Sequence, residues 1–320
     1  MIITVTLNAA MDRTLAVPNF RLGQRHRATE QTAMAGGKGV NVARSLKALG
    51  QPVIATGVAG GPTGTRIIEH LTEEAILNDF VRIREESRTS IAVVDPTSNV
   101  QTEINERGPA VTEAELELFT DKLLYLAKGA EVCVFAGSLP REVGPDLYAR
   151  LVAEVGRLGV TTVLDAEGEP LRLGTRAGPS VVTPNELEAE ELVGHEFADE
   201  EDRHVSVREI IDLGATEAIM TRSDGCLALL LEGQERCLYR ATLEPLEPVS
   251  AVGSGDAFLA GFVSARYGGS APADCLRFGV ACGAESTQHF GAGVIDPREV
   301  GRLLPEVRVE RLETAAVAPS

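Results

Sequence analysis

The chain has 320 residues and a formal net charge of −17, from 47 acidic residues against 30 Lys and Arg. This balance argues against a nucleic-acid partner, because binding to a phosphate backbone requires clustered Lys and Arg. The chain has no apolar run of about 18 residues and no basic segment before an apolar N-terminal core, so we expect a cytoplasmic protein without a membrane span.

Strand and helix patterns alternate from the N-terminus onward. The β-branched run "IITVTLNAA" predicts a first strand, and residues 38–50 place apolar residues at helical spacing before a glycine. "PVIATGVAG" then predicts a strand and "GTRIIEHLTEEAI" a helix. "RTSIAVVD" and "NVQTEINERGP", separated by the turn signal "PTS", predict a β-hairpin that interrupts the alternation.

After Pro109 the alternation becomes regular. A capping box of Thr112 and Glu115 opens a helix, and "EVCVFAG", "VTTVLDAEG" and "PSVVTP" predict strands between further helices. Strands that alternate with helices require crossover connections, so the sequence predicts a three-layer α/β/α fold with a mostly parallel central sheet. We expect one domain over residues 1–310, followed by a disordered tail at 311–320.

The stretch "GSGDAF" combines a tight turn, a helix start and one carboxylate. The small residues Gly253, Ser254 and Gly255 leave successive N–H groups free at the helix start, which is an anion site. A carboxylate at Asp256 suits such a site if it takes a proton while its neighbours stabilise charge on a transferring phosphoryl group. The alternative is that Asp256 only caps the helix.

The stretch "AGGKGVN" has the same arrangement of a glycine turn before a helix start, and we expect Lys38 and Asn41 to project into the mouth of the site. It is not a Walker loop, because Val40 stands where Ser or Thr belongs. Neither glycine motif is a dinucleotide fingerprint, since Val42 and Phe258 occupy the third glycine positions, and this disfavours a dinucleotide-dependent oxidoreductase. The alternative is a glycine turn that leads into a buried helix.

Further polar residues follow predicted strands, where the ligands of such sheets gather. In "TPNELE", Asn185 and Glu188 lie three apart on one helix face, and their oxygens suit Mg²⁺ bound through water. An acidic helix start is also ordinary complementation of the helix dipole. Four more residues lie at predicted strand edges, and their number favours a site: Asp12, Arg88, Ser138 and Asp165.

Taken in order, these motifs resemble the PfkB (ribokinase-like) carbohydrate kinases over about residues 1–300. The stretches that carry the resemblance are "TLNAAMD", "GGKGVNVARSLKALG", "TEINERGP", "AGSLP", "TPNELE" and "VGSGDAFLAGF". They look closest to the sugar-phosphate branch that contains 1-phosphofructokinase and tagatose-6-phosphate kinase. The resemblance implies ATP-dependent phosphorylation of a ketohexose monophosphate, first of all fructose 1-phosphate to fructose 1,6-bisphosphate. Tagatose 6-phosphate and fructose 6-phosphate are the alternative substrates.

The resemblance also implies an architecture and a set of roles. A small β lid from segments 12–33 and 88–107 would cover the site and form the interface of a homodimer. Asp256 would be the catalytic base, and the N–H groups of Gly253, Ser254 and Gly255 the anion hole. The sugar phosphate would be held by Asp12, Gly37, Lys38, Asn41, Arg88 and Ser138.

The donor side follows in the same way. The resemblance assigns the nucleotide to Asn185, Thr221, Ser223, Gly225 and Ser254. Asn185 and Glu188 would position Mg²⁺ with ATP. A monovalent cation such as K⁺ would bind main-chain oxygens of Ser250, Val252, Ser286 and Gly291.

The charges agree with a substrate that already carries a phosphate, because Lys38 and Arg88 are cations at the mouth of an acidic protein. The donor loop "MTRSDG" matches the family pattern Thr/Ser-x-Gly-x-x-Gly only in part, with Met220 and Arg222 where the hydroxyl and the first glycine belong. This departure supports a second hypothesis of another class, a non-catalytic sugar-phosphate sensor.

Overall fold

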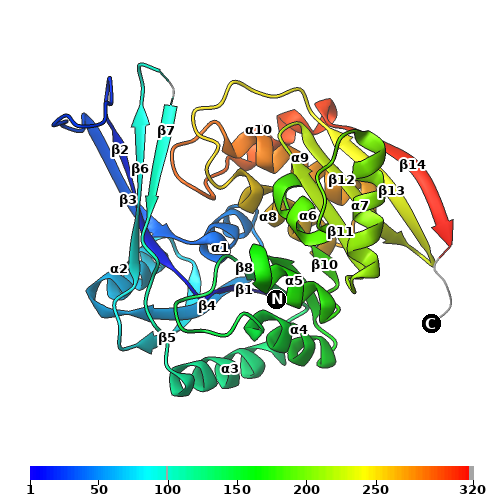
Figure 1. Ribbon diagram of the computed structural model, residues 1–320, viewed down its shortest axis with the longest axis horizontal. Coiled ribbons are helices and arrows are strands. Elements are labelled where there is room, and N and C mark those ends of the chain that lie inside the picture. Colours follow the sequence, from blue (N-terminus) through cyan, green and yellow to red (C-terminus); the bar gives the residue numbers. More distant parts are fainter. Residues whose placement is uncertain (99, 317–320) are drawn as a thin grey trace.

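Most strands of the computed structural model, which describes residues 1–98 and 100–316, join in one large sheet (Figure 1). Its order is β14-β13-β12-β11-β10-β9-β8-β1-β4-β5. The strands are β1 (Ile2–Thr6), β4 (Val53–Gly60), β5 (Leu77–Ile83), β8 (Val132–Ala136), β9 (Thr161–Asp165), β10 (Val181–Val182), β11 (Glu217–Arg222), β12 (Gly225–Glu232), β13 (Glu235–Thr242) and β14 (Arg308–Ala316).

The part of this sheet from β5 to β11 is parallel throughout. Apart from the edge strand β5, its strands are largely buried on both faces, which explains continuous apolar runs such as "VCVFA" in β8. Alternate residues of β8 enter different cores, because Val134 belongs to one hydrophobic cluster while Cys133 and Phe135 belong to the other.

Helices cover both faces of the sheet, which confirms the predicted three-layer α/β/α fold. One cluster packs under α1 (Lys38–Ala48), α2 (Gly61–Glu73), α8 (Ser254–Tyr267), α9 (Pro272–Ser286) and α10 (Pro297–Leu303), which leads into a 3₁₀ turn at Leu304–Glu306. The other packs under α3 (Glu113–Ala127), α4 (Leu147–Arg157), α5 (Gly168–Arg176), α6 (Glu186–Val193) and α7 (Glu200–Asp212).

The far arm of the sheet is antiparallel, and it corrects the expectation of a disordered tail from residue 311. Residues up to Ala316 form β14, which pairs with β13. A β-bulge shifts the register between Leu238 and Tyr239, whose partners are Glu313 and Arg311, so that Leu312 is an extra residue. The bulge interrupts the period-two pattern and hides the strand in the sequence. Residues 317–320 of the predicted tail lie outside the described residues.

A second sheet stands apart from the first, at the upper left of Figure 1. It has the order β3-β2-β6-β7, with bounds β2 (Ala10–Ala16), β3 (Glu30–Gly36), β6 (Arg88–Asp95) and β7 (Val100–Asn105). Strands β2 and β6 are parallel neighbours, and each is paired on its other side with an antiparallel partner. The segments proposed as a lid, 12–33 and 88–107, therefore contribute strands to this separate sheet.

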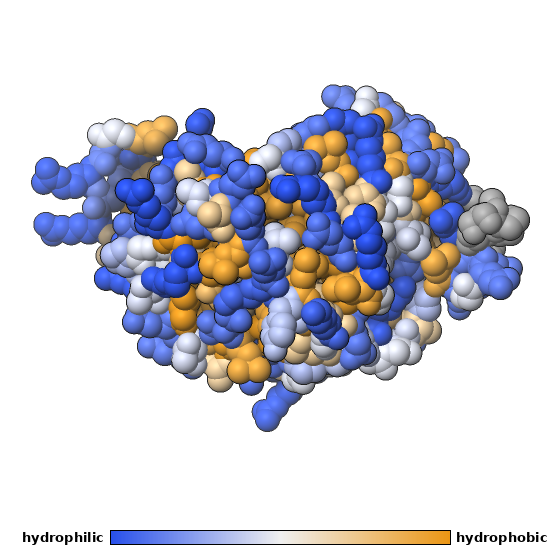
Figure 2. All heavy atoms as spheres, turned by 90° about the horizontal axis from the view of Figure 1, so that it is seen from below, coloured by the Kyte–Doolittle hydropathy of each residue, from blue (hydrophilic) through white to orange (hydrophobic). Residues whose placement is uncertain are grey.

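None of the helices within the described ranges combines the length and apolarity needed to cross a lipid bilayer. Figure 2 shows the underside of the molecule, where hydrophilic side chains alternate with smaller apolar areas.

Candidate active site

A cavity of about 1080 Å³ lies between the carboxyl ends of the parallel strands and the second sheet. Both sheets contribute to its lining, for example through Arg88 and Ser90 of β6 and Asp165 at the end of β9. The predicted site residues that line it are Asp12, Gly37, Lys38, Asn41, Arg88, Asn185, Glu188, Thr221, Ser223, Gly225, Ser250, Val252, Gly253, Ser254, Gly255, Asp256 and Gly291. Ser138 and Ser286 do not belong to this lining.

Asp256 lies in the first turn of α8, with only 5% of its surface exposed. Its Oδ2 accepts a hydrogen bond of 2.8 Å from Nδ2 of Asn41. Burial raises the pKa of Asp256 from 3.8 to about 7, although the charge of Lys38 and the bond from Asn41 oppose this shift. A carboxyl group with such a pKa exchanges its proton near neutral pH, as a general base requires.

Asn41 is itself held in place by Arg44, three residues later on α1. Nη1 of Arg44 donates to Oδ1 of Asn41 at 3.2 Å and to the carbonyl of Ala292 at 2.9 Å. Nη2 donates to the carbonyl of Ala35. With its oxygen occupied in this way, Asn41 presents its amide N–H to Asp256, and the buried arginine thereby orients the predicted base.

The turn before Asp256 requires glycine. Gly253 has φ of 79°, and a Cβ there would lie 2.8 Å from the backbone of Ala292. The N–H of Ser254 donates to the carbonyl of Ala251 at 3.3 Å. Within the described chain the N–H groups of Gly255 and Asp256 have no acceptor, as expected for a first helical turn, so they are free to bind an anion.

Lys38 opens α1 and lies among carboxylates. Its Nζ is 3.0 Å from Oδ1 of Asp165 and 3.9 Å from Oε1 of Glu188. The pKa of Lys38 is raised, mainly by Asp165 and further by Asp256 and Glu188. The ammonium group therefore stays charged, and it lines the same cavity as Asp256.

Asn185 and Glu188 form a capping box at the start of α6. The N–H of Glu188 donates to Oδ1 of Asn185 at 2.9 Å, and the N–H of Asn185 donates to Oε2 of Glu188 at 2.8 Å. Burial raises the pKa of Glu188. The other carboxylate oxygen, Oε1, is the one that faces Lys38.

Arg88 and Asp12 line the cavity from strands of the second sheet. Nε of Arg88 donates to the carbonyl of Asn8 at 3.1 Å, and Nη1 donates to that of Glu106 at 3.3 Å. Burial raises the pKa of Asp12 to about 6, against the opposing charges of Arg88 and Arg44. The two predicted substrate cations, Lys38 and Arg88, are therefore held by different partners.

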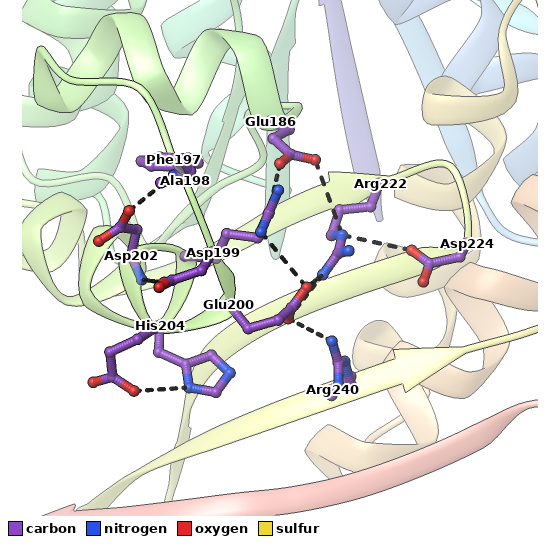
Figure 3. Close-up of polar contacts among 12 residues, drawn as sticks. Glu186, Phe197, Ala198, Asp199, Glu200, Asp202, His204, Arg222, Asp224 and Arg240 are labelled. Atoms are coloured by element: carbon purple, nitrogen blue, oxygen red, sulfur yellow. Dashed lines mark hydrogen bonds and ion pairs between the residues drawn. The ribbon is translucent and has the colours of Figure 1, made fainter.

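The loop between β11 and β12 carries Thr221, Ser223 and Gly225 along the cavity. Arg222, where the family pattern has glycine, also lines the cavity and lies in a cluster of charged side chains (Figure 3). Its Nη1 is 3.0 Å from Glu200, and its Nε lies 3.5 Å from Asp224 and 4.0 Å from Glu186. Arg203 and Arg240 share these acidic partners. The cluster ties the loop to the starts of α6 and α7.

The segments proposed to hold K⁺ meet at one point, because the N–H groups of Val249 and Ser250 both donate to the carbonyl of Thr287. The hydroxyl of Ser286 donates to the carbonyl of Gly283. Ser138 accepts a hydrogen bond from Asn8 at 3.1 Å.

The sequence reasoning missed Arg44. A buried arginine on an apolar helix, three residues after a candidate ligand, is the signal that would have indicated it. Thr183, which precedes the capping box, was missed as well. Its hydroxyl is buried in the cavity wall and has no hydrogen-bond partner among the described residues.

Comparisons with known proteins agree with this geometry. The profile of pfkB family carbohydrate kinases matches residues 3–298. A Borreliella burgdorferi protein named 1-phosphofructokinase is 32% identical over 316 residues, which cover 98% of this chain and 100% of that protein. Two solved structures of phosphofructokinase-2 from Escherichia coli are similar over 95% of this chain and 98% of theirs. The complex with substrates and products has a TM-score of 0.89 at 26% identity, and the potassium complex 0.88 at 25%.

Proposed function

Because this chain belongs to the pfkB family of carbohydrate kinases, we propose that it transfers the γ-phosphoryl group of ATP to the C6 hydroxyl of fructose 1-phosphate. Family membership makes it a phosphotransferase with an alcohol as acceptor. The observation that carries the proposal is the buried carboxylate of Asp256, with a pKa of about 7 beside the free N–H groups of a helix start. The relative named 1-phosphofructokinase supports the choice of substrate.

In the proposed reaction, a carboxylate oxygen of Asp256 takes the proton of the C6 hydroxyl. The hydroxyl oxygen forms a bond to the γ-phosphorus while the bond to the bridging oxygen breaks, and ADP leaves. Asn41 donates to the other side of the same carboxyl group and holds it in one orientation. Positioning of this kind supplies much of the acceleration when two reactants must be aligned.

Negative charge spreads over the transferring phosphoryl group, and two features of the chain stabilise it. The free N–H groups of Gly255 and Asp256 point from the start of α8. Lys38 keeps its proton because Asp165 and Glu188 flank it, so it supplies a fixed positive charge. We therefore assign Lys38 to the transferring phosphoryl group and Arg88 to the phosphorylated sugar.

The carboxylates of Asp165 and Glu188, together with the unpartnered hydroxyl of Thr183, suit Mg²⁺ bound with ATP. Among the described residues no group of three or more His, Cys, Asp or Glu side chains forms a metal site. This fits an ion that keeps most of its waters and takes phosphate oxygens as ligands. Bound there, Mg²⁺ would neutralise charge on the phosphates.

Replacing Glu188 by Gln should raise the Mg²⁺ concentration needed for half-maximal rate by about tenfold. Gln keeps an oxygen for the N–H of Asn185, so the capping box and the thermal midpoint should be preserved. The measurement is the initial rate against Mg²⁺ at fixed ATP, with the exposed Glu191→Gln as control. An unchanged Mg²⁺ requirement in Glu188→Gln would contradict this assignment.

A panel of phosphosugars tests the proposed function. Release of ADP should be fastest with fructose 1-phosphate, followed by fructose 6-phosphate and tagatose 6-phosphate, and much slower with free fructose or nucleosides. The reason is that Arg88 contributes binding energy only when the sugar carries a phosphate. Turnover of unphosphorylated sugars alone would refute the substrate class.

We also infer that the second sheet is a lid and the interface of a homodimer, because the outer strand β7 exposes Val100 and Ile104 to solvent.

We further propose that K⁺ binds the main-chain oxygens near Ser250, Val252, Ser286 and Gly291. It is supported by the contact between these two segments and by the potassium complex of the Escherichia coli enzyme.

A further inference from the structure

A second hollow of about 270 Å³ adjoins the main cavity and shares Arg88 with it. It is lined by Glu86, Arg88, Glu106, Arg107, Gly108 and Arg141. Three arginines thus line one small space, although acidic residues outnumber basic ones in the chain by 47 to 30. We call this space the arginine pocket.

The pocket is built by segments that other contacts hold in place. Arg88 begins β6, Arg107 and Gly108 follow β7, and Arg141 follows β8. Nε of Arg141 donates to the carbonyl of Gly108 at 2.8 Å, and its backbone N–H donates to that of Pro109 at 3.0 Å. These bonds join the two loops, so the pocket exists before any ligand enters, which lowers the entropic cost of binding.

The acidic residues of the pocket already have partners. Glu86 accepts from the hydroxyl of Thr63 at 2.7 Å, and Glu106 accepts from the N–H of Thr89 at 2.9 Å. A further carboxylate, Glu85, pairs with Arg141 at 3.0 Å.

Two of the three arginines keep donors for a ligand. The hydrogen bonds of Arg88 within the described chain go to main-chain carbonyls, and burial lowers its pKa. The guanidinium of Arg107 has neither a hydrogen bond nor an ion pair with any residue that the structure describes. A phosphate dianion would accept hydrogen bonds from the free donors of Arg88 and Arg107, since guanidinium pairs with phosphate through two parallel hydrogen bonds.

We propose that Arg107 is a further specificity-determining residue, which binds from the arginine pocket, together with Arg88, the phosphate that the sugar substrate already carries. This inference rests on the proposed function and names the part of the chain that selects phosphorylated sugars. C1 and C6 lie at opposite ends of a ketohexose, and Arg88 links the pocket to the cavity in which Asp256 receives the reacting hydroxyl. Arg141 positions the loop that carries Arg107.

The test is Arg107→Gln, assayed with fructose 1-phosphate and with free fructose. The KM for fructose 1-phosphate should rise about tenfold, because a hydrogen bond to a charged group is lost. The kcat should stay within about twofold of wild type, since Arg107 contacts no reacting atom, and the KM for free fructose should not change. Inhibition by inorganic phosphate should weaken by the same factor. Arg302→Gln, an exposed arginine of α10, is the matched control.

An unchanged KM for fructose 1-phosphate in Arg107→Gln overturns the inference, and so does an equal rise for both sugars. If wild-type protein turns over no sugar phosphate, the proposed function fails instead. Calorimetry of inorganic phosphate binding to wild type and to Arg107→Gln then tests separately whether the pocket binds phosphate. Weaker binding in the variant supports the pocket, and equal binding overturns it.

Discussion

Replacing Asp256 by Asn should reduce kcat by roughly 10²–10⁴, the range expected for the loss of a general base. The amide keeps the shape of the side chain and an oxygen for the hydrogen bond from Asn41, but it cannot accept a proton from the acceptor hydroxyl. The measurement is ADP release at saturating ATP and sugar phosphate. The exposed Asp146→Asn, on a surface ion pair, serves as control and should keep the wild-type rate.

The pH dependence of kcat/KM should report the same group. The base acts only when deprotonated, and its pKa in the free protein is about 7. The rate should therefore rise with pH toward 7 and level off above it, and Asp256→Asn should lack this limb. Asp12 has a pKa of about 6, so it also loses its proton as pH rises, but at lower pH than Asp256.

The stability of the Asn variant follows from the sign of the same shift. The native state holds the proton of Asp256 more tightly than the unfolded chain does, because the pKa is raised from 3.8 to about 7. The contribution of Asp256 to stability is therefore full below pH 3.8 and is lost as pH rises toward 7. Asp256→Asn does not ionise, so above pH 7 it should be at least as stable as wild type.

Binding measurements separate the kinase from the sensor hypothesis. A kinase should lose its rate in Asp256→Asn while its dissociation constant for sugar phosphate stays within about threefold, since the lost group acts in the transition state. Wild-type protein that binds sugar phosphate but releases no ADP would favour the sensor. A variant with wild-type kcat would remove Asp256 from the chemistry.

The parallel part of the fold is predictable because its strands are buried on both faces. The continuous apolar run of β8 and the buried, β-branched start of β9, separated by a helical pattern, leave few alternatives to crossover connections. β14 is not predictable in this way, because the extra residue Leu312 breaks its alternation. Its pairing with β13, which lies some seventy residues earlier, has no local signal.

The candidate site is likewise predictable from the sequence only in part. Glycine turns at helix starts point to Lys38, Asn41 and Asp256, since the local backbone is what makes these stretches unusual. Ser138 follows a strand in the same way, yet its hydroxyl faces Asn8. Arg107 lies in a loop whose neighbours are set by tertiary packing, so no spacing in the sequence marks it.

Arg44 shows most clearly what tertiary structure adds, and its removal should have the second large effect. Arg44→Leu should lower the free energy of unfolding by about 3–5 kcal/mol, the cost of breaking a buried charged network. The carboxylate of Glu74 and the carbonyls of Ala35 and Ala292 would lose their donors. The measurement is equilibrium unfolding in urea, and a loss below about 1 kcal/mol would contradict the assignment.

A second variant keeps this prediction testable if Arg44→Leu does not fold. Arg44→Lys retains the charge but not the planar fork, so it should fold and still leave Asn41 without its fixed donor. Its kcat should fall about tenfold, because the base then loses its single orientation. Glu74→Gln is the matched control: it weakens the ion pair with Arg44 on the side away from Asn41 and should reduce stability while kcat is kept. If Arg44→Lys and Glu74→Gln both lost kcat only in proportion to their unfolded fractions, Arg44 would stabilise the fold without orienting the base.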